Sequence, residues 1–201
     1  MTSQTHIQMK EGSLWGGAAK AGVPKEFIDL SNLRQIPDHQ EVFVCKKTDR
    51  SLMFELVELE KSAPTLKAAL QYHWKMLAKH NNALSSQENK VLWVSNSFTQ
   101  SELPNFSKQL VATSPKVEGA CCVGQMKVAK YNESAKNIVQ IYLAVIRLHS
   151  VSTDLLISFN DPIQISNRSS SASSEKPTTD AFRTFQLIIK SFQMKDWSLF
   201  G

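Results

Sequence analysis

The chain has few of the residues that disulfide-bonded and zinc-binding proteins need. Only three of its 201 residues are cysteines, and an odd number cannot form a complete set of disulfides. Cys121 and Cys122 are adjacent, which does not suit normal disulfide geometry, and no C-x-x-C or zinc-like His/Cys spacing is present. We therefore expect buried free thiols in a reducing compartment and no metal site.

Long hydrophobic runs are also missing. Nothing approaches the 18 consecutive apolar residues of a membrane span, and the opening MTSQTHIQMKEGS has no apolar signal-peptide core. The composition, with 42% hydrophobic and 20% charged residues, is ordinary for a globular domain with a sizeable core. The sequence thus predicts a soluble intracellular protein without a membrane partner.

The positive charge is not concentrated anywhere along the chain. The net charge of +5 invites a nucleic-acid interpretation, but the lysines are scattered and only Lys46 and Lys47 are adjacent. A surface that follows a phosphate backbone needs a denser stripe of cations. We expect a solvated surface and no nucleic-acid partner.

The sequence carries no motif of a common enzyme class. The patterns G-x-x-x-x-G-K-[ST], G-x-G-x-x-G and G-x-S-x-G are all absent. Of the five dispersed histidines, His73 lies on the apolar stripe of an expected helix and is interpreted as a core residue. His39, beside Asp38 and near Glu41, has the setting of a general base, but no nucleophile is fixed nearby. We expect neither an enzyme nor a cofactor.

The order of the expected elements favours an α+β fold. Alternating and apolar runs predict strands, two of them in a hairpin, at residues 41–45, 51–59, 90–98, 118–129, 138–149 and 153–160. Periodicity and start signals predict helices at 65–79 and 180–192. Runs of strands with few helices between them indicate a largely antiparallel central sheet of about six strands, flanked by helices.

We predict a single domain with one tail and one loop. Residues 1–12 are expected to be a flexible tail and residues 13–201 the domain. Residues 167–179 (NRSSSASSEKPTT) have too little apolar surface to fold, so we expect a mobile serine-rich loop. In the helix that follows, the expected buried stripe consists of Phe182, Phe185, Ile189 and Phe192.

Two acidic features lie between residues 27 and 60. Residues 34–41 (RQIPDHQE) form an elbow with a Pro-Asp turn, and Glu55 and Glu58 lie within the apolar strand 52–59. Carboxylates inside a strand lose hydration and a core does not need them, so they suggest a surface built to meet a partner. Because side chains alternate along a strand, the two glutamates can share a surface only if a bulge or the strand end intervenes.

A purely structural explanation of these acids is also open. Glu58 would then belong to an exposed strand end, and Glu55 would pair with a lysine or arginine across the sheet. Asp29, Asp38 and Glu41 would be helix caps and turn formers. Composition alone favours this structural explanation, because acidic residues are common on protein surfaces.

The residues around the elbow resemble one protein family. The matching segments are Leu14-Trp15-Gly16-Gly17-Ala18, Phe27 to Phe43 with its Pro37-Asp38-x-Gln40-Glu41-Val42-Phe43 block, Ser51 to Glu58, Arg147-Leu148, Thr153-Asp154-Leu155 and Trp197-Ser198-Leu199-Phe200-Gly201. In this pattern, which extends over nearly the whole chain, the sequence is similar to the Ran guanine-nucleotide release factor (Mog) family. It departs from the family at Glu55, often aspartate there, and at Trp15, usually phenylalanine or tyrosine.

The resemblance implies a PsbP-like α/β/α fold and a non-enzymatic regulator. This regulator would bind the small GTPase Ran and promote GTP release in nucleocytoplasmic transport. The resemblance also implies that Glu55 and Glu58 form the acidic pair needed for Ran contact. Around this pair, the further expected contact residues are Asp38, Glu41, Gln40, Asp29 and Arg34.

Within this set, Arg34 is expected to be either a contact or a structural clamp on one of the acids. We expect a monomer, present in nucleus and cytoplasm. The alternative function is an adaptor that docks another protein through the same acidic surface without nucleotide release. A small-molecule-binding module is a more distant alternative.

Overall fold

The computed structural model describes residues 6–95, 98, 117–130 and 132–201. The strands are β1 (Met9–Leu14), β2 (Ala19–Pro24), β3 (Ile28–Asp29), β4 (Gln40–Val44), β5 (Ser51–Glu58), β6 (Asn89–Ser95), β7 (Val117–Ala129), β8 (Lys136–Leu148), β9 (Thr153–Gln164) and β10 (Gln193–Met194). The helices are α1 (Leu66–His80) and α3 (Ala181–Ser191), and the short 3-10 turns are η1 (Trp15–Gly17), η2 (Leu30–Asn32), η3 (His149–Val151) and η4 (Trp197–Phe200).

Seven of the described strands form the central sheet, in the order β3-β4-β5-β9-β8-β7-β6. Every neighbouring pair is antiparallel. The expected α+β class and each of the six expected strands are confirmed, but the expected count is one too low. The additional strand, β3, has two residues, which is too few to leave a periodic signal in the sequence.

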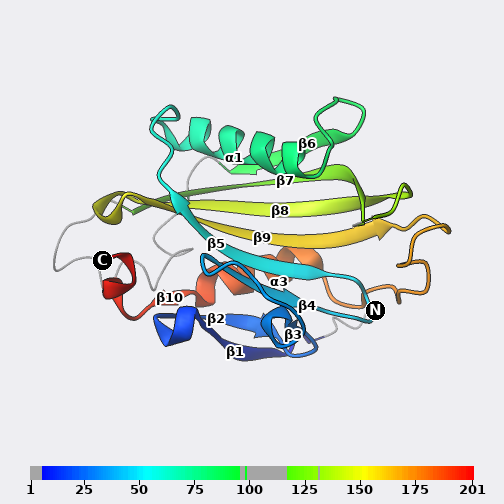
Figure 1. The fold of residues 1–201 in the computed structure, drawn as a ribbon, viewed down its shortest axis with the longest axis horizontal. Coiled ribbons are helices and arrows are strands. Elements are labelled where there is room, and N and C mark those ends of the chain that lie inside the picture. Colours follow the sequence, from blue (N-terminus) through cyan, green and yellow to red (C-terminus); the bar gives the residue numbers. More distant parts are fainter. Residues whose placement is uncertain (1–5, 96–97, 99–116, 131) are drawn as a thin grey trace.

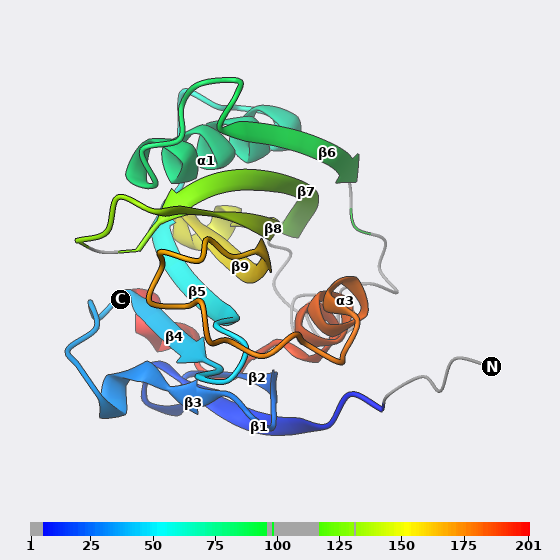
Figure 2. The same cartoon turned by 90° about the vertical axis from the view of Figure 1, so that its right-hand side faces the viewer.

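The central sheet has different cover on its two faces. Helix α1 packs across β7 and β8 on one face, and α3 and a small sheet of β1, β2 and β10 lie on the other (Figure 1). The view turned by 90° separates these layers and shows that α1 lies over β7 rather than over β4 and β5 (Figure 2). The part of the sheet formed by β4, β5 and β9 therefore has no helix above it on the α1 face within the described residues.

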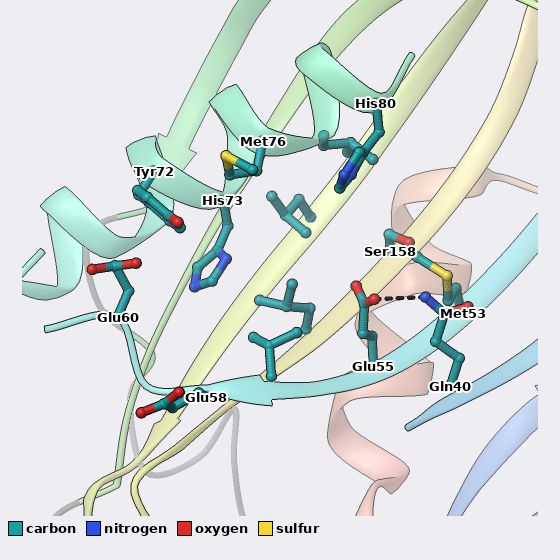
Figure 3. A pocket seen from close by; sticks show the side chains of 14 residues that line it. Gln40, Met53, Glu55, Glu58, Glu60, Tyr72, His73, Met76, His80 and Ser158 are labelled. Atoms are coloured by element: carbon teal, nitrogen blue, oxygen red, sulfur yellow. Dashed lines mark hydrogen bonds between the residues drawn. The ribbon is translucent and has the colours of Figure 1, made fainter. Parts of the chain in front are cut away.

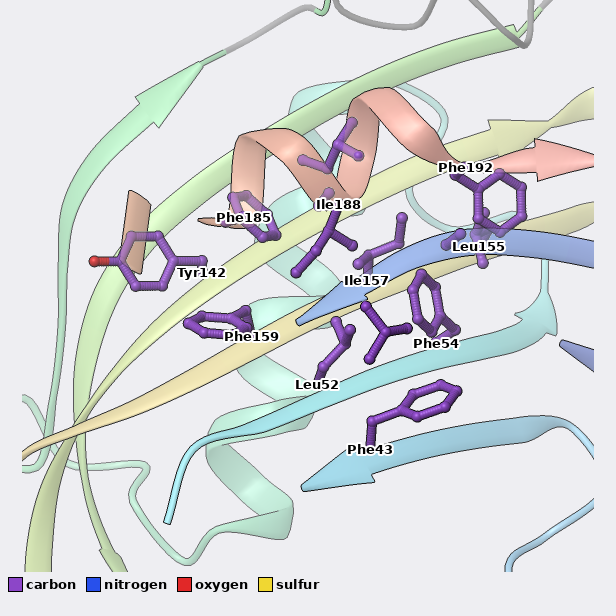
Figure 4. Close-up of a cluster of buried hydrophobic side chains, with 14 of the residues drawn as sticks. Phe43, Leu52, Phe54, Tyr142, Leu155, Ile157, Phe159, Phe185, Ile188 and Phe192 are labelled. Atoms are coloured by element: carbon purple, nitrogen blue, oxygen red, sulfur yellow. The ribbon is translucent and has the colours of Figure 1, made fainter. Parts of the chain in front are cut away.

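Two apolar cores hold the layers together. The larger core joins the β4–β5 hairpin to α3 and includes Phe43, Phe54, Phe185 and Phe192 (Figure 4). The smaller core lies between α1 and the sheet and includes Trp74. Alternate residues of β8 enter the two cores, so both faces of this strand are buried. That arrangement explains why β8 reads as a continuous apolar run in the sequence.

The tail expected at residues 1–12 is too long. Residues 9–14 form β1, which pairs with β2 and places Leu14 in the larger core. Gly12 permits this close pairing, because a Cβ atom there would lie 2.6 Å from the side chain of Val23. Residues 1–5 of the expected tail lie outside the described residues.

The helix expected at 180–192 is confirmed, but its buried face is shifted. Asp180 caps α3 by accepting a hydrogen bond from the Arg183 backbone N–H at 2.6 Å. Phe182 was expected in the core, yet it is 38% exposed. The buried stripe instead follows Ala181, Thr184, Phe185, Ile188 and Ile189. Phe182 falls beside this stripe, and its ring contacts those of Trp93 and Tyr142 at the flank of the core.

The serine-rich loop is attached to the body of the protein, contrary to the expectation of a mobile loop. Ser171 is buried, and its hydroxyl donates to Asp49 Oδ2 at 2.6 Å. Ser169 is also buried and donates to Glu133 Oε2 at 3.0 Å. The apolar area of this segment is small, as expected. The segment is held instead by hydrogen bonds to residues distant in the sequence, and a hydropathy pattern does not reveal such bonds.

A buried ionic cluster fixes the connection from β5 to α1. The guanidinium of Arg147 donates to Asp154 Oδ1 at 2.9 Å, and both side chains are at most 1% exposed. His73 Nε2 lies 2.9 Å from Asp154 Oδ2, so the expectation of a satisfied core histidine is confirmed. Arg147 also donates to the backbone carbonyls of Glu60 at 2.9 Å and Ala63 at 2.6 Å. The cluster thereby ties the loop after β5 to strands β8 and β9.

We expect Phe185→Ala to lower the free energy of unfolding by about 3–5 kcal/mol, because a fully buried ring would leave a cavity. Phe182→Ala is the matched control, since it removes the same atoms from a side chain that is 38% exposed, and it should cost much less. Urea unfolding followed by circular dichroism measures both. Equal losses would show that the two rings are buried alike.

We expect trypsin to cut slowly after Arg168 in the folded protein, because the serine-rich loop is hydrogen-bonded on both sides of the cleavage site. Asp49→Ala removes the acceptor of Ser171 and should speed cleavage there. Mass spectrometry of a digestion time course identifies the cut, with Glu26→Ala as a surface control. Rapid cleavage in the unsubstituted protein would contradict the attached loop.

We expect stability to decline in acid through Asp154. Burial would raise the pKa of this carboxyl, but hydrogen bonds from His73 and Arg147 outweigh burial and lower the pKa. Stability from this group is therefore present above the unfolded-state pKa of about 3.9 and is lost as pH falls through the lower folded-state value. Urea unfolding at several pH values should show a smaller loss of stability below about pH 4 for Asp154→Asn. An unchanged pH dependence in this variant would contradict the assignment.

Candidate functional site

The β4–β5 hairpin decides which way the acidic side chains point. Gln40 lies opposite Glu55 in the register, and Glu41 lies opposite Phe54. Residues directly opposite each other share a face of the sheet, and successive residues alternate. Glu55 and Gln40 therefore face the α1 side, whereas Glu41 faces the other side together with the core residue Phe54.

Glu55 lies at the edge of a hollow under α1 with little solvent around it. Its side chain is 19% exposed, and Gln40 Nε2 donates to its Oε1 at 2.6 Å. His39 Nε2 lies 3.6 Å from the same oxygen. Among the described residues no lysine or arginine forms an ion pair with Glu55. The structural explanation, which expected such a partner across the sheet, is therefore wrong for Glu55. The carboxylate is thus mostly removed from water, with a neutral amide as its main partner.

Glu58 does not share the orientation of Glu55. The pairing of β5 with β9 continues without a register shift to Glu58, so no bulge brings the two carboxylates onto one face. Glu58 is exposed at the last position of β5 and borders the hollow at its end. Figure 3 shows Glu55 directed toward the hollow and Glu58 directed away from α1. Glu55 and Glu58 border the same hollow only because Glu58 lies at the end of β5.

The hollow itself has a volume of about 470 Å³. Its apolar lining comes from β5, α1, β8 and β9, and it includes Met53, Val57, Met76, Leu77, Leu143 and Leu156. Glu60 adds a third carboxylate at the rim (Figure 3). Hydrogen bonds from Ser62, and further from Tyr72, lower the pKa of Glu60. Glu60 therefore stays ionised and contributes negative charge to the rim.

Glu41 and its acidic neighbours occupy a different hollow on the opposite face. This hollow, of about 570 Å³, is lined by Asp29, Asp38 and Glu41, among other residues. The Trp15 backbone N–H donates to Glu41 Oε1 at 2.5 Å. Burial and the nearby Asp29 raise the pKa of Glu41. The expectation that Asp38 and Glu41 extend the surface around Glu55 is therefore wrong for Glu41, and only Gln40 lines both hollows.

The elbow has the local structure that its sequence predicts. Asp29 Oδ1 accepts from the Ser31 backbone N–H at 2.8 Å and caps η2. The Gln40 backbone N–H donates to the Pro37 carbonyl at 2.8 Å, which closes the expected turn. Asp38 lies exposed in this turn. The structural explanation thus holds for Asp29 and for the turn.

Arg34 does not clamp an acidic residue. It is exposed, and within the described part of the chain it forms no ion pair with a carboxylate. It lines a third hollow, of about 480 Å³, together with Val42 and Val44 of β4. The clamp role was one of two expected for Arg34, and no carboxylate partner for it is found within the described residues; the role of a contact stays a prediction.

Two further features bear on what this surface binds. No group of three or more potential metal-ligating side chains gathers anywhere in the described residues. Neither described helix has the length and apolarity that a bilayer crossing demands. The rim itself offers carboxylates beside an apolar hollow, which suits a cationic group on an aliphatic stem.

Relatives with known names share the sequence over nearly its full length. A family profile described as Ran-interacting Mog1 protein matches residues 12–162. The probable Ran guanine nucleotide release factor of Dictyostelium discoideum is 38% identical over 193 residues, which cover 93% of this chain and 94% of that protein. The nuclear import protein mog1 of Schizosaccharomyces pombe is 31% identical over 196 residues, which cover 94% and 98%.

Solved structures give the same result for the fold. The crystal structure of the Saccharomyces cerevisiae Ran-binding protein Mog1p superposes with a TM-score of 0.68 at 25% identity, covering 98% of this chain and 100% of that one. PsbP of Synechocystis sp. PCC 6803 superposes with a TM-score of 0.50 at 8% identity and covers 97% of each chain. The expected PsbP-like fold is confirmed. By its sequence and its fold, this chain belongs to the Ran-interacting Mog1 protein family.

Proposed function

We propose that this protein binds the small GTPase Ran and promotes release of GTP from it, in support of nuclear protein transport. Membership of the Ran-interacting Mog1 family supports Ran as the partner. The names of two relatives, a Ran guanine nucleotide release factor and a nuclear import protein, support the release activity and the transport role. The single structural observation that carries the proposal is Glu55, a mostly desolvated carboxylate that pairs with no lysine or arginine of the described residues and lies 3.6 Å from His39 Nε2.

Nucleotide release requires differential binding. A factor can open a GTPase only if it binds the open or nucleotide-free state more tightly than the closed one. Moving such an equilibrium from 1:99 to 99:1 takes roughly 5.5 kcal/mol of differential affinity. Close charge pairs at interfaces contribute about 1.5–7 kcal/mol in favourable cases, so one preorganised carboxylate could supply a substantial part.

The geometry assigns different roles to the acidic residues. Glu55 is held in place by Gln40 and has already lost most of its water, so a cation that reaches it meets a prepared partner. Glu58 is exposed at the rim, where a charge mainly steers the approach of a partner. Glu41 accepts from the backbone of the Trp-Gly-Gly turn and Asp29 caps η2, which supports a structural role for both residues beside the proposed contact. Asp38 is left as an exposed charge in the turn of the elbow.

The proposed regulator acts by binding and not by covalent chemistry. We infer that it is a monomer that needs no cofactor, is found in both nucleus and cytoplasm and has no nucleic-acid partner. An adaptor that docks a protein through the same surface would bind Ran without releasing nucleotide. The release measurement below separates these two functions.

We expect Glu55→Ala to weaken Ran binding by about 2–5 kcal/mol, mainly through faster dissociation. Glu58→Ala should slow association instead, and its effect should shrink as the salt concentration rises. Surface plasmon resonance at two salt concentrations measures both rates. Glu26→Ala, at an exposed turn outside the described hollows, is the control. Wild-type kinetics in the Glu55 variant, with an unchanged melting curve, would remove this residue from the site.

The same proteins test nucleotide release. Ran loaded with a fluorescent GTP analogue should lose fluorescence faster with the unsubstituted protein than alone. The Glu55→Ala variant should accelerate the loss less. Binding without acceleration would support the adaptor, and no binding would overturn the proposal.

A further inference from the structure

Two of the hollows on the α1 face are parts of one groove. The hollow bordered by Glu55 and the hollow bordered by Arg34 share Met53, Leu77 and Ser158 in their linings. The first measures about 470 Å³ and the second about 480 Å³. The groove follows β5, whose eight residues span roughly 25 Å at about 3.3 Å per residue. The groove lies between α1 and the part of the sheet formed by β4, β5 and β9.

Ser158 lies at the middle of this groove with an unsatisfied hydroxyl. It is opposite Met53 on β5 and Leu143 on β8, so its side chain lies on the α1 face. It is 3% exposed, and its hydroxyl has no hydrogen-bond partner among the described residues. A buried polar group without a partner destabilises the fold, so its presence in an otherwise apolar lining calls for a reason.

The groove is oppositely charged at its two ends. Glu55, Glu58 and Glu60 border one end. The other end is lined by Arg34, an exposed cation that forms no ion pair within the described residues. Asp49, Arg50 and Lys130 also line it, but Arg50 is paired with Asp161 and Lys130 with Asp49, so the unpaired charge at this end is that of Arg34. The middle is apolar, with Leu156 toward one end and Val139 toward the other. A ligand that satisfies the whole groove therefore needs a cation, an apolar middle with one hydrogen-bonding group, and an anion.

We propose that the groove docks one amphipathic segment of the GTPase, which lies along β5 in a fixed direction. A basic side chain of the segment enters at Glu55, an apolar side chain covers Met53, and a polar group bonds the Ser158 hydroxyl. An acidic side chain of the segment then meets Arg34. This inference rests on the proposed function and extends it from the acidic rim to the whole groove.

Charge complementarity at both ends favours a peptide segment over the other possible occupants. A second copy related by a two-fold axis would place one concave groove against another, so neither apolar middle would be filled. A small apolar molecule would fill one hollow and leave the charged ends unused. A segment with opposite charges at its ends uses all of the features, and the charges set its direction.

Ser158→Ala gives the sharpest test. Removing an unpartnered hydroxyl should leave the melting temperature unchanged or raise it, because no hydrogen bond in the free protein is lost. Affinity for Ran should nevertheless fall about three- to tenfold, since the partner loses a hydrogen bond. Thr48→Val is the matched control: Thr48 also has a buried unpartnered hydroxyl, but it lines neither hollow. This control should bind Ran like the unsubstituted protein.

Two more variants test the ends and the middle. Arg34→Glu reverses the charge at the far end and should weaken binding at least tenfold at low salt, and less at high salt. Met53→Trp fills the shared middle and should weaken binding, with a melting curve as the check that the variant folds. Isothermal titration calorimetry with Ran measures all four variants.

The outcomes separate this inference from the proposed function. If Glu55→Ala loses affinity while the Ser158, Arg34 and Met53 variants bind like the unsubstituted protein, only the acidic rim is used and the groove inference is overturned. If Glu55→Ala also binds normally, the proposed site fails as well. Loss in the Ser158 variant with none in the Thr48 control supports the groove.

Discussion

The buried pair of Arg147 and Asp154 is the interaction on which the rest of this surface depends. Two charges removed from water are tolerated only when their hydrogen-bonding capacity is filled, and here His73 and two backbone carbonyls fill it. The cluster joins β8, β9, α1 and the loop after β5 at one point. The three carboxylates of the groove, from Glu55 to Glu60, lie directly before or within that loop. An apolar replacement could hold the layers together, but it would not fix the direction in which this loop leaves the sheet.

Local periodicity accounts for most of the fold and for little of the site. Six strands and two helices follow from patterns within 5 to 15 neighbouring residues, and the structure contains them. The contacts that the sequence could not reveal are polar and distant: Glu41 reaches Trp15 across 26 positions, and Asp49 reaches Ser171 across 122. Such pairs are set by topology, which decides which loops meet, and hydropathy carries no trace of them. The face of the sheet to which Glu55 points follows from strand alternation, which is a local property. Its hydrogen-bond partner depends on which strand lies beside β5, and the sequence does not reveal that.

The groove shows how a stable fold can keep a binding surface that is costly to maintain. Within the described residues, Glu55 has lost much of its water without gaining a lysine or arginine partner, and the Ser158 hydroxyl has lost its water without gaining a hydrogen-bond partner. Each of these groups destabilises the free protein slightly, and each would be repaid on contact with a complementary partner. Large apolar cores on both sides of the sheet supply the stability that such groups remove. Unfavourable buried groups of this kind are expected at positions where binding, and not folding, determines which residue is present.

The small sheet has a consequence for how the protein is made. Strand β2 lies between β1, which starts at Met9, and β10, which ends at Met194, so the last of the described strands completes a sheet begun by the first. Helix α3, just before β10, also supplies Phe185 and Phe192 to the larger core. The larger core therefore cannot close before residues 181–194 have been synthesised, and until then its apolar β-strands stay exposed. Contacts between segments this far apart in the sequence slow folding, because loop-closure entropy is lost before the contacts form.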